Sequence, residues 1–397
     1  MRGFSTDYSE NVGSGISGSP ISEPAAVITD QVAAEAAERG ARFAEAIEAN
    51  RISDFEKKGD ARKGEKADQM VHVSTFCTIG DKIYMTYYAN TKASKEDPLN
   101  QTARLVYCHR SNPQDKVYLD IQTVGDDLYG KHIYALYDTI LAKKDDDTLY
   151  VMWTAKADDQ YYRLCRSFSV QSGELGPVEV NRFRVGEITN DFSTSGIQNA
   201  MTENGLPYKT MYSDIGIMQK FTQRQEQGKV YYYTGAYSGD FNCIIKTCDF
   251  LTWEYVSQPD FDNESKWENA AYVYGDKCYY FVRQQDEVPY GFLTAYDLIR
   301  KKWEKPVLIA DCQSRSDFIV YAGNLYLVHA PVDREHIGIV KVNTDDIAAS
   351  TPVLQADMKS SCFYPFVQYL DKNAIGMSYT VDRKSIRLSW FDPQKFL

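Results

Sequence analysis

From residue 71 to the C-terminus, apolar and polar residues alternate in short runs that come in pairs. VSTFCTIGDKIYMTYYA, AAYVYGDKCYYFVRQ and FIVYAGNLYLVHAP each contain two such runs around a turn rich in Gly, Asp or Asn. Alternation with a period of two is typical of a strand with one buried face, and a short polar turn between two such strands predicts a hairpin. The pattern therefore predicts antiparallel β-structure over residues 71–397.

The predicted hairpins recur at a nearly constant interval. Four of their turns are spaced by 47, 48 and 50 residues, at Gly228, Gly275, Gly323 and Asn373. We count six hairpins, which begin near residues 72, 138, 217, 268, 315 and 363. A repeat of about 50 residues with about four strands is typical of a β-propeller. We expect an all-β propeller of six blades; five or seven are the alternatives, because residues 187–214 fit either a loop or part of a further blade.

The first 70 residues follow a different pattern. Residues 1–22 are rich in Gly and Ser and predict a flexible N-terminus. In residues 23–52, which are rich in Ala and Glu, apolar side chains recur on one side of a helix. These side chains are Val32, Ala36, Phe43 and Ile47. We expect a short helical arm packed on the propeller, with a partner-binding or dimerising arm as the alternative, and a charged linker over residues 53–70.

The net charge and the distribution of cysteines argue against several classes of function. The formal net charge is −11, whereas a nucleic-acid binder needs a positive face. No apolar run reaches the roughly 20 residues of a membrane helix, and no secretory signal is visible. The eight cysteines are scattered without a C-x-x-C pair, which predicts reduced core residues and no zinc site. We expect a cytoplasmic protein that needs no cofactor and binds neither nucleic acid nor membrane.

One segment carries a resemblance to a known superfamily. KTCDFLTWEYV, residues 246–256, resembles the Asp box, S-x-D-x-G-x-T-W, of sialidase-like β-propellers. Asp249, Thr252 and Trp253 match the box, whereas Thr247 stands at the serine position and the glycine is missing. In that superfamily the box is a structural turn between the outer strands of a blade. IRKKWEKPV repeats the Trp-Glu pair fifty residues later, so we expect the two segments to be outer strands of consecutive blades.

The resemblance implies a carbohydrate-active protein. The superfamily includes sialidases, other exo-acting glycoside hydrolases, uronic-acid-specific polysaccharide lyases and non-catalytic proteins. True sialidases hold the substrate carboxylate with three arginines from different blades, and four arginines of this chain are candidates for such a cluster. They are Arg110, Arg166, Arg283 and Arg315. The F/Y-R-I-P motif of that family is absent, which argues against sialidase activity itself. The 30 tyrosines suit both strands and the face of a sugar ring.

In a propeller, residues at the start of the innermost strands converge on one mouth of the central channel. Counting back twelve positions from Tyr84, Tyr150, Tyr231, Tyr279, Tyr326 and Met377 selects His72, Asp138, Gln219, Trp267, Ser314 and Pro365. Their charged and aromatic neighbours are Glu268, Arg315, Asp317 and Tyr364. His132 lies at the entry to the second blade, and Asp214 ends an insertion that can fold over the mouth.

These side chains predict two kinds of chemistry. Glycoside hydrolysis needs a carboxylic acid and a second carboxylate, and our catalytic candidates are Asp138, Glu268, Asp317 and His72. Our substrate-binding candidates are His132, Trp267, Arg315, Tyr364, Asp214 and Arg283. The leading hypothesis is an exo-acting glycoside hydrolase that cleaves a terminal sugar from an oligosaccharide.

Two alternatives remain open at this stage. The first is a lyase acting next to a uronic acid, which needs a base, an acid and a cation. His72, His132, Tyr364 and Arg315 could fill those roles. The second is a non-catalytic propeller that binds a glycan or a protein.

Overall fold

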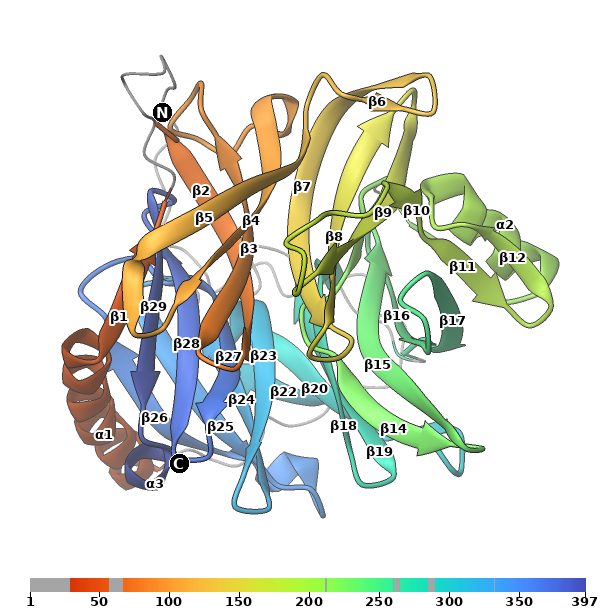
Figure 1. Ribbon diagram of the computed structural model, residues 1–397. Helices are drawn as coiled ribbons and strands as arrows, with labels where there is room; N and C mark the ends of the chain where they lie inside the picture. The colour runs from red at the N-terminus through yellow and green to blue at the C-terminus, as the bar shows by residue number, and fades with distance from the viewer. Residues whose placement is uncertain are drawn as a thin grey trace, which may run out of the picture.

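The computed structural model describes residues 29–56, 67–210, 213–259, 261, 265–284, 290–331 and 333–397. The strands of these ranges form six sheets, whose neighbouring strands are almost all antiparallel. The sheets surround a central axis, and inner strands such as β2 and β7 run downward in Figure 1. The segment predicted to be flexible, residues 1–22, lies outside the described residues, as do residues 57–66 of the predicted linker.

The first three sheets follow one another along the chain. The first contains β2 (Met70–Ile79), β3 (Lys82–Asn90), β4 (Gln101–His109) and β5 (Asn112–Thr123). The second contains β6 (Asp127–Leu128), β7 (Lys131–Lys143), β8 (Thr148–Ala157), β9 (Gln160–Ser169) and β10 (Glu179–Val180). The third contains β11 (Arg182–Val185), β12 (Ile188–Asp191), β13 (Ile215–Ile217), β14 (Thr222–Glu226), β15 (Lys229–Ser238), β16 (Phe241–Thr247) and β17 (Thr252–Ser257).

The last three sheets complete the ring. The fourth contains β18 (Ser265–Tyr274), β19 (Lys277–Gln284), β20 (Tyr290–Asp297), β21 (Lys302–Trp303) and β22 (Val307–Ala310). The fifth contains β23 (Gln313–Tyr321), β24 (Asn324–Ala330), β25 (His336–Val342) and β26 (Thr351–Asp357). The sixth contains β27 (Phe363–Asp371), β28 (Ala374–Val381), β29 (Ser385–Phe391) and β1 (Arg51–Phe55).

Each sheet packs on the next one around the axis. The contacts that link consecutive sheets are β2 with β7, β8 with β13, β15 with β18, β18 with β23, β23 with β27, and β27 with β2. Because the sixth sheet packs on the first, the sheets form a closed ring, and the predicted all-β propeller is confirmed. The described strands of the ring form six sheets.

The N-terminal region contributes a strand as well as a helix. α1 (Asp30–Ala49) packs on β26 and β29, and its buried Phe43 lies 5.0 Å from the Phe391 ring and 5.3 Å from the Phe396 ring, the latter in α3 (Pro393–Phe396). β1 then pairs antiparallel with β29. Residues 51–55 therefore form the outer strand of the sixth sheet, which corrects the assignment of these residues to the helix end and linker.

The insertion of residues 187–214 extends the third sheet and forms no further blade. β11 pairs in parallel with β17 and antiparallel with β12, and α2 (Thr194–Glu203) packs on both β11 and β12. The only other helical turns in the described residues are the short 3₁₀ segments Pro98–Asn100 and Ile347–Ala349. None of the described helices has the length and apolarity needed to span a membrane.

The segment KTCDFLTWEYV forms the outer turn that the Asp-box resemblance implied. Asp249 Oδ1 accepts hydrogen bonds from the backbone N–H groups of Leu251 and Thr252, both at 2.8 Å. Trp253 follows on β17 and is fully buried. Asp297 accepts two backbone bonds in the same way, ahead of Trp303 on β21. The recurring Trp-Glu pair thus marks equivalent outer turns of the third and fourth sheets.

Candidate functional site

The innermost strands of five sheets have irregular pairing at about the same depth in the ring. Pairing registers shift at His72–Thr75, Tyr137–Ile140, Ser265–Asn269, Gln313–Asp317 and Phe363–Phe366. Four residues in or beside these bulges have left-handed backbone conformations: Val73, Asp138, Ser314 and Tyr364, with φ of 55°, 60°, 78° and 55°. A bulge changes the direction in which a side chain points, and such bulges occur often beside active sites. Here they lie close to the start of four inner strands and in the middle of β7 (Lys131–Lys143).

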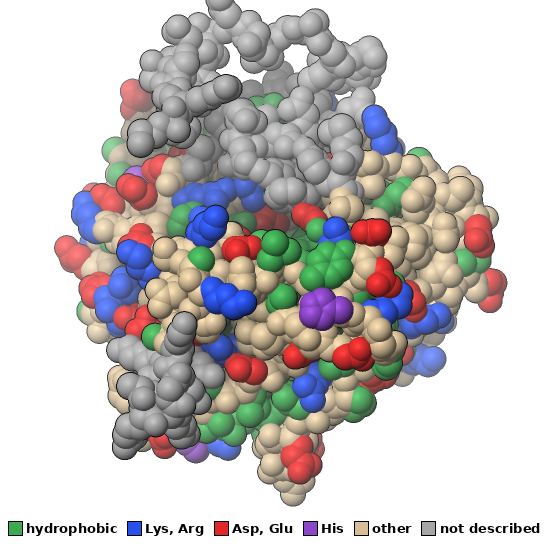
Figure 2. Space-filling model, turned by 90° about the horizontal axis from the view of Figure 1, so that it is seen from above, with side chains coloured by type: hydrophobic (Ala, Val, Ile, Leu, Met, Phe, Trp, Pro, Cys, Tyr) green, Lys and Arg blue, Asp and Glu red, His purple; other side chains and the backbone are tan. Residues whose placement is uncertain are grey.

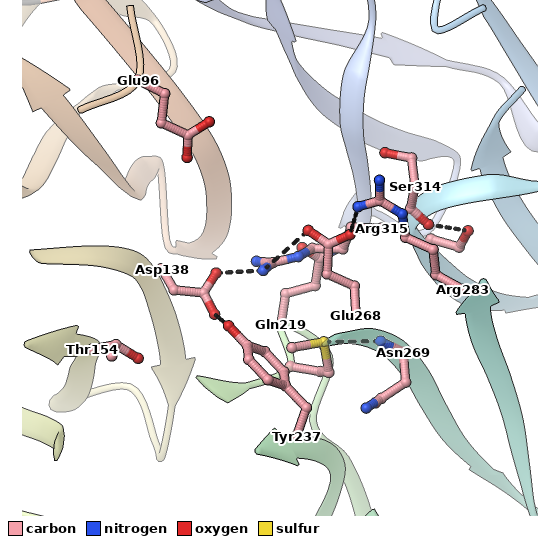
Figure 3. A network of polar contacts seen from close by, with 12 residues as sticks. Glu96, Asp138, Thr154, Gln219, Tyr237, Glu268, Asn269, Arg283, Ser314 and Arg315 are labelled. Atoms are coloured by element: carbon pink, nitrogen blue, oxygen red, sulfur yellow. Dashed lines mark hydrogen bonds and ion pairs between the residues drawn. The ribbon is translucent and has the colours of Figure 1, made fainter. Parts of the chain in front are cut away.

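Arg315 is the centre of a buried polar cluster at this level (Figure 3). Its Nη2 contacts Oδ1 of Asp138 and lies 3.9 Å from Oε1 of Glu268. Glu268 also pairs through Oε2 with Nη1 of Arg283. All four residues are at most 5% exposed. The fifth sheet thus brings one guanidinium to carboxylates from the second and fourth sheets.

Asp138 is held from three sides. The hydroxyl of Tyr237 donates to its Oδ2 at 3.0 Å. Arg163 donates to its backbone oxygen at 3.0 Å and lies 4.0 Å from Oδ2. A Cβ at Gly216 would lie 2.6 Å from Oδ2 of Asp138, so only glycine fits beside this carboxylate. This arrangement fixes Asp138 as a partner that orients Arg315.

Tyr364 and Glu268 form the pair with the clearest chemical meaning. Burial raises the pKa of Tyr364, and the negative charge of Glu268 adds to that shift. Burial also acts to raise the pKa of Glu268, but Arg283, Arg315 and a hydrogen bond from Tyr364 more than offset it and lower that pKa. At neutral pH the tyrosine is therefore protonated and donates to an ionised carboxylate.

The side chain of His72 packs against the ring of Tyr364. Its ring stacks on the Tyr364 ring at 4.8 Å, and Nδ1 lies 3.1 Å from the hydroxyl of Thr380. His72 is fully buried, and burial together with the charges of Arg383, Arg315 and Arg334 keeps its pKa well below the usual value. The enclosed imidazole packs on the tyrosine ring and is uncharged at neutral pH.

Further arginines surround this part of the mouth. Arg383 and Arg334 lie 4.8 Å and 5.5 Å from the Phe363 ring, and Arg383 pairs with Glu96 at 3.3 Å. Two arginines of the predicted cluster lie elsewhere. Arg110 pairs with Asp371 on the surface, and Arg166 donates to the backbone oxygens of Gly176 and Ile121.

Asp317 is turned into the wall of the channel. Lys220 Nζ lies 3.0 Å from its Oδ2, and the N–H of Val367 donates to the same oxygen at 2.9 Å. Burial raises its pKa to about 6, although Lys220 opposes the shift. The structure therefore places this carboxylate in a buried ion pair that links the third, fifth and sixth sheets, apart from Arg315.

The remaining candidates lie at different distances from the cluster. His132 is exposed on β7, six positions before Asp138. The side chain of Trp267 lies outside what the structure describes. Asp214 is half-buried, and burial raises its pKa although the nearby Tyr137 and Tyr161 act against that shift. Asp214 also feels the charge of Asp138, so it belongs to the rim of the same site.

The sequence analysis missed several members of the site. Arg163 is fully buried in the middle of β9, and a charge at a core position of an alternating strand was the available signal. Glu96 lies in a loop, where its side chain accepts from the hydroxyl of Tyr88 at 2.5 Å; nothing in the alternation pattern marks it. Tyr237 is one tyrosine among many and carried no signal of its own.

The mouth has a mixed surface chemistry. Figure 2 shows the face at which the inner strands begin, and Lys or Arg side chains alternate there with Asp and Glu around a small hydrophobic group beside a histidine. Among the described residues, no group of three His, Cys, Asp or Glu side chains could hold a metal ion. The eight cysteines are free, and Cys248 alone of them is exposed.

The fold has known counterparts among solved structures. No protein-family profile and no curated protein sequence matches this chain. The NanB sialidase of Streptococcus pneumoniae, as its K499G mutant, matches 88% of this chain and 71% of its own, with a TM-score of 0.54 and 8% identity. The Hadza microbial sialidase Hz136 matches 83% and 66%, with a TM-score of 0.55 and 10% identity. The chain therefore has the sialidase-like β-propeller fold that its degenerate Asp box implied.

Proposed function

We propose that this protein is an exo-acting glycoside hydrolase that removes a terminal acidic sugar from an oligosaccharide. The observation that carries the proposal is the half-buried Tyr364 beside the buried Glu268, with the Arg315 guanidinium 5.1 Å from the Tyr364 ring and Arg283 paired with Glu268. Most glycosidases use two carboxyl groups, whereas sialidases use a tyrosine nucleophile. A tyrosine that donates to an ionised carboxylate has its general base already in place.

The arginines point to an acidic substrate. Nε and Nη1 of Arg315 are buried and have no hydrogen-bond partner among the described residues. A buried N–H group without a partner is costly, and a guanidinium is well suited to bind a carboxylate. The charges of Arg283 and Arg334 also act on Tyr364. A sugar carboxylate beside Arg315 would satisfy these donors and place the anomeric carbon near the tyrosine oxygen.

The reaction then needs two proton transfers. Glu268 takes the hydroxyl proton as the Tyr364 oxygen bonds to the anomeric carbon, and the glycosidic C–O bond breaks. Glu96, in its protonated form, gives the departing oxygen its proton; in Figure 3 its carboxyl group faces the space above Asp138 and Arg315. In the second step Glu96 accepts a proton from the water that attacks the anomeric carbon, and Glu268 returns its proton to the departing Tyr364 oxygen. Glu96 is then protonated again, Glu268 is ionised and Tyr364 is a neutral phenol.

The test is capture of the covalent intermediate. Fluorides of a sialic acid and of a uronic acid, each with a second fluorine beside the anomeric carbon, form such intermediates but hydrolyse them slowly. Intact-mass and peptide analysis should find one sugar on Tyr364, and Tyr364→Phe should remain unlabelled. Label on Asp138, or turnover of the matching natural glycan without label on Tyr364, would overturn the mechanism.

The lyase alternative predicts a different product. Tyr364 and Arg315 could also serve elimination next to a uronic acid, so the same screen should follow the ultraviolet absorbance of an unsaturated uronate. Growth of that absorbance would replace the hydrolase proposal. Absence of both products on every acidic glycan would favour a binding protein.

A further inference from the structure

We propose that the rim between the second and third sheets is a binding subsite for the sugar that leaves. This inference rests on the proposed function and names the part of the substrate that the second sheet recognises. Tyr134, Lys156 and Tyr161 form the subsite, with Asp214 at its inner end. We call these four residues the rim platform.

Three adjacent strands build the platform. Lys156 on β8 lies with its Nζ 5.5 Å from the ring of Tyr134 on β7 and 5.1 Å from the ring of Tyr161 on β9. All three side chains are half-buried. A cation held between two aromatic rings keeps both rings in fixed orientations. The result is a pair of flat apolar faces with an ammonium group between them.

The platform is continuous with the catalytic cluster. The rings of Tyr161 and Tyr137 lie 5.9 Å apart, and both side chains lie close enough to Asp214 to lower its pKa. Tyr137 directly precedes Asp138, whose charge acts on Asp214. A chain of contacts therefore runs from the exposed rim to the carboxylate that holds Arg315.

The position of the rim platform determines which sugar of the substrate it would contact. Tyr364, Arg283 and Arg315 belong to the sixth, fourth and fifth sheets, respectively, and they define where the terminal acidic sugar is held. The platform lies across the axis on the second sheet, beyond Asp138. A glycan whose terminal sugar is held by Arg315 would place its next ring there. Tyrosine faces suit a pyranose ring, and Lys156 and Asp214 supply a donor and an acceptor for its hydroxyls.

The experiment compares two substrates that share one terminal sugar. One is an oligosaccharide, and the other is the glycosyl fluoride, whose leaving group has no ring to bind. Tyr134→Ala should lower the ratio of kcat/KM on the oligosaccharide to that on the fluoride about tenfold. Tyr161→Ala should act in the same direction. Tyr134→Phe keeps the ring and should leave the ratio within about twofold of the original value.

The third sheet offers a matched control. Lys246 lies 4.3 Å from the ring of Tyr231 and 5.7 Å from the ring of Tyr233, close to the hairpin turn at Gly228. Tyr231→Ala disrupts the same kind of contact away from the mouth and should leave the ratio unchanged. An unchanged ratio in Tyr134→Ala and Tyr161→Ala would overturn the subsite. If the unsubstituted protein hydrolyses neither substrate, the proposed function itself fails.

Discussion

At the scale of single residues, the hydroxyl of Tyr364 is the first group to test. Tyr364→Phe keeps the ring that contacts His72 and Arg315 but removes the nucleophile. We expect kcat to fall by roughly a thousandfold or more, with KM changed less than about threefold. Steady-state kinetics and thermal unfolding, measured together, check this. Tyr274→Phe removes a hydroxyl that bonds to Gly323 O and is the control; a Tyr364→Phe enzyme that keeps a tenth of the activity would contradict the assignment.

In the step that forms the intermediate, Glu96 should matter only when the leaving group needs a proton. Glu96→Gln retains the shape of the side chain beside Tyr88 and Arg383 but cannot donate a proton as a carboxylic acid does. We expect kcat/KM on the natural glycan to fall by about 10² or more, while kcat/KM on the glycosyl fluoride, which reports formation of the intermediate alone, stays within about tenfold of the original. Equal losses on both substrates would show that Glu96 has a structural role. The measurement is initial rates on both substrates.

Asp317 should make the free energy of unfolding depend on pH. Its pKa is raised by burial to about 6 in the folded state, against about 3.9 in an unfolded chain. The folded state therefore binds this proton more tightly, and the contribution of the group to the unfolding free energy falls as pH rises from about 4 to 7. Asp317→Asn should remove that part of the pH dependence in urea unfolding. Asp297→Asn is the control, because the pKa of Asp297 is lowered by backbone hydrogen bonds and its effect has the opposite sign.

Part of the site could be predicted from the sequence, because the position of a residue along its inner strand determines whether it reaches the site. Glu268, Arg315 and Tyr364 lie near the start of inner strands and Asp138 lies in the middle of one, and alignment on the second-strand tyrosines selected these positions or their neighbours. The alternation of a strand separates Asp317 from Arg315 by two residues on one nominal face, but the bulge between Gln313 and Asp317 sends their side chains to different partners. No local pattern reveals a bulge of that kind.

At the scale of elements, the contact between α1 and the fifth sheet depends on one glycine. A Cβ on Gly40 would lie 1.8 Å from the carbonyl oxygen of Gln355 on β26. Gly40→Ala should gain about 1 kcal/mol of helix propensity and yet destabilise the protein by about 1–3 kcal/mol through overpacking. The free energy of unfolding, measured in urea, gives the net effect of the gain in helix propensity and the loss from overpacking. Ala37→Gly, on the exposed side of the helix, should cost about 1 kcal/mol; a stabilised Gly40→Ala protein would show that the helix can move away from β26.

The sequence predicts the hairpins but not β1. A hairpin turn leaves a local signal in the sequence, whereas pairing between distant segments leaves none. Turns such as Gly228, Gly275 and Gly323 require positive φ, with values of 80°, 61° and 76°, so they leave a local signal in the sequence. RISDF has only two apolar residues in five and is separated from β29 by more than 300 residues. Its pairing is set by the edge of the sixth sheet and not by its own composition. Non-local pairing of this kind is absent from any local pattern.

At the scale of the whole molecule, two long-range links hold the ring together. Inside the channel, Lys220 of the third sheet reaches Asp317 of the fifth and the carbonyl oxygen of Val367 in the sixth. At the periphery, β1 joins the N-terminal segment to the last sheet through its pairing with β29. The first link lies below the catalytic cluster and the second closes the chain into a circle. Both constrain the distance between blades, on which the geometry around Arg315 depends.

The peripheral link can be made covalent to measure its contribution. Asp54 on β1 is paired directly with Arg387 on β29, and such partners have Cα separations that a disulfide can bridge. The bond would close a loop of 333 residues (387 − 54). In the chain-entropy account it should stabilise the protein by up to about 5 kcal/mol.

Asp54→Cys/Arg387→Cys in a Cys248→Ser background avoids the exposed native thiol. The oxidised protein should unfold at higher urea concentration than the same protein after reduction, while the two single-cysteine variants should not respond to reductant. Because the substituted side chains lie on the outer edge, kcat on the acidic glycan should stay the same. If oxidation leaves the unfolding midpoint unchanged, strain in the folded protein cancels the entropic gain of the cross-link. If oxidation raises the midpoint, constraining the unfolded chain at this seam stabilises the closed ring, on which the arrangement of Tyr364, Glu268 and Arg315 depends.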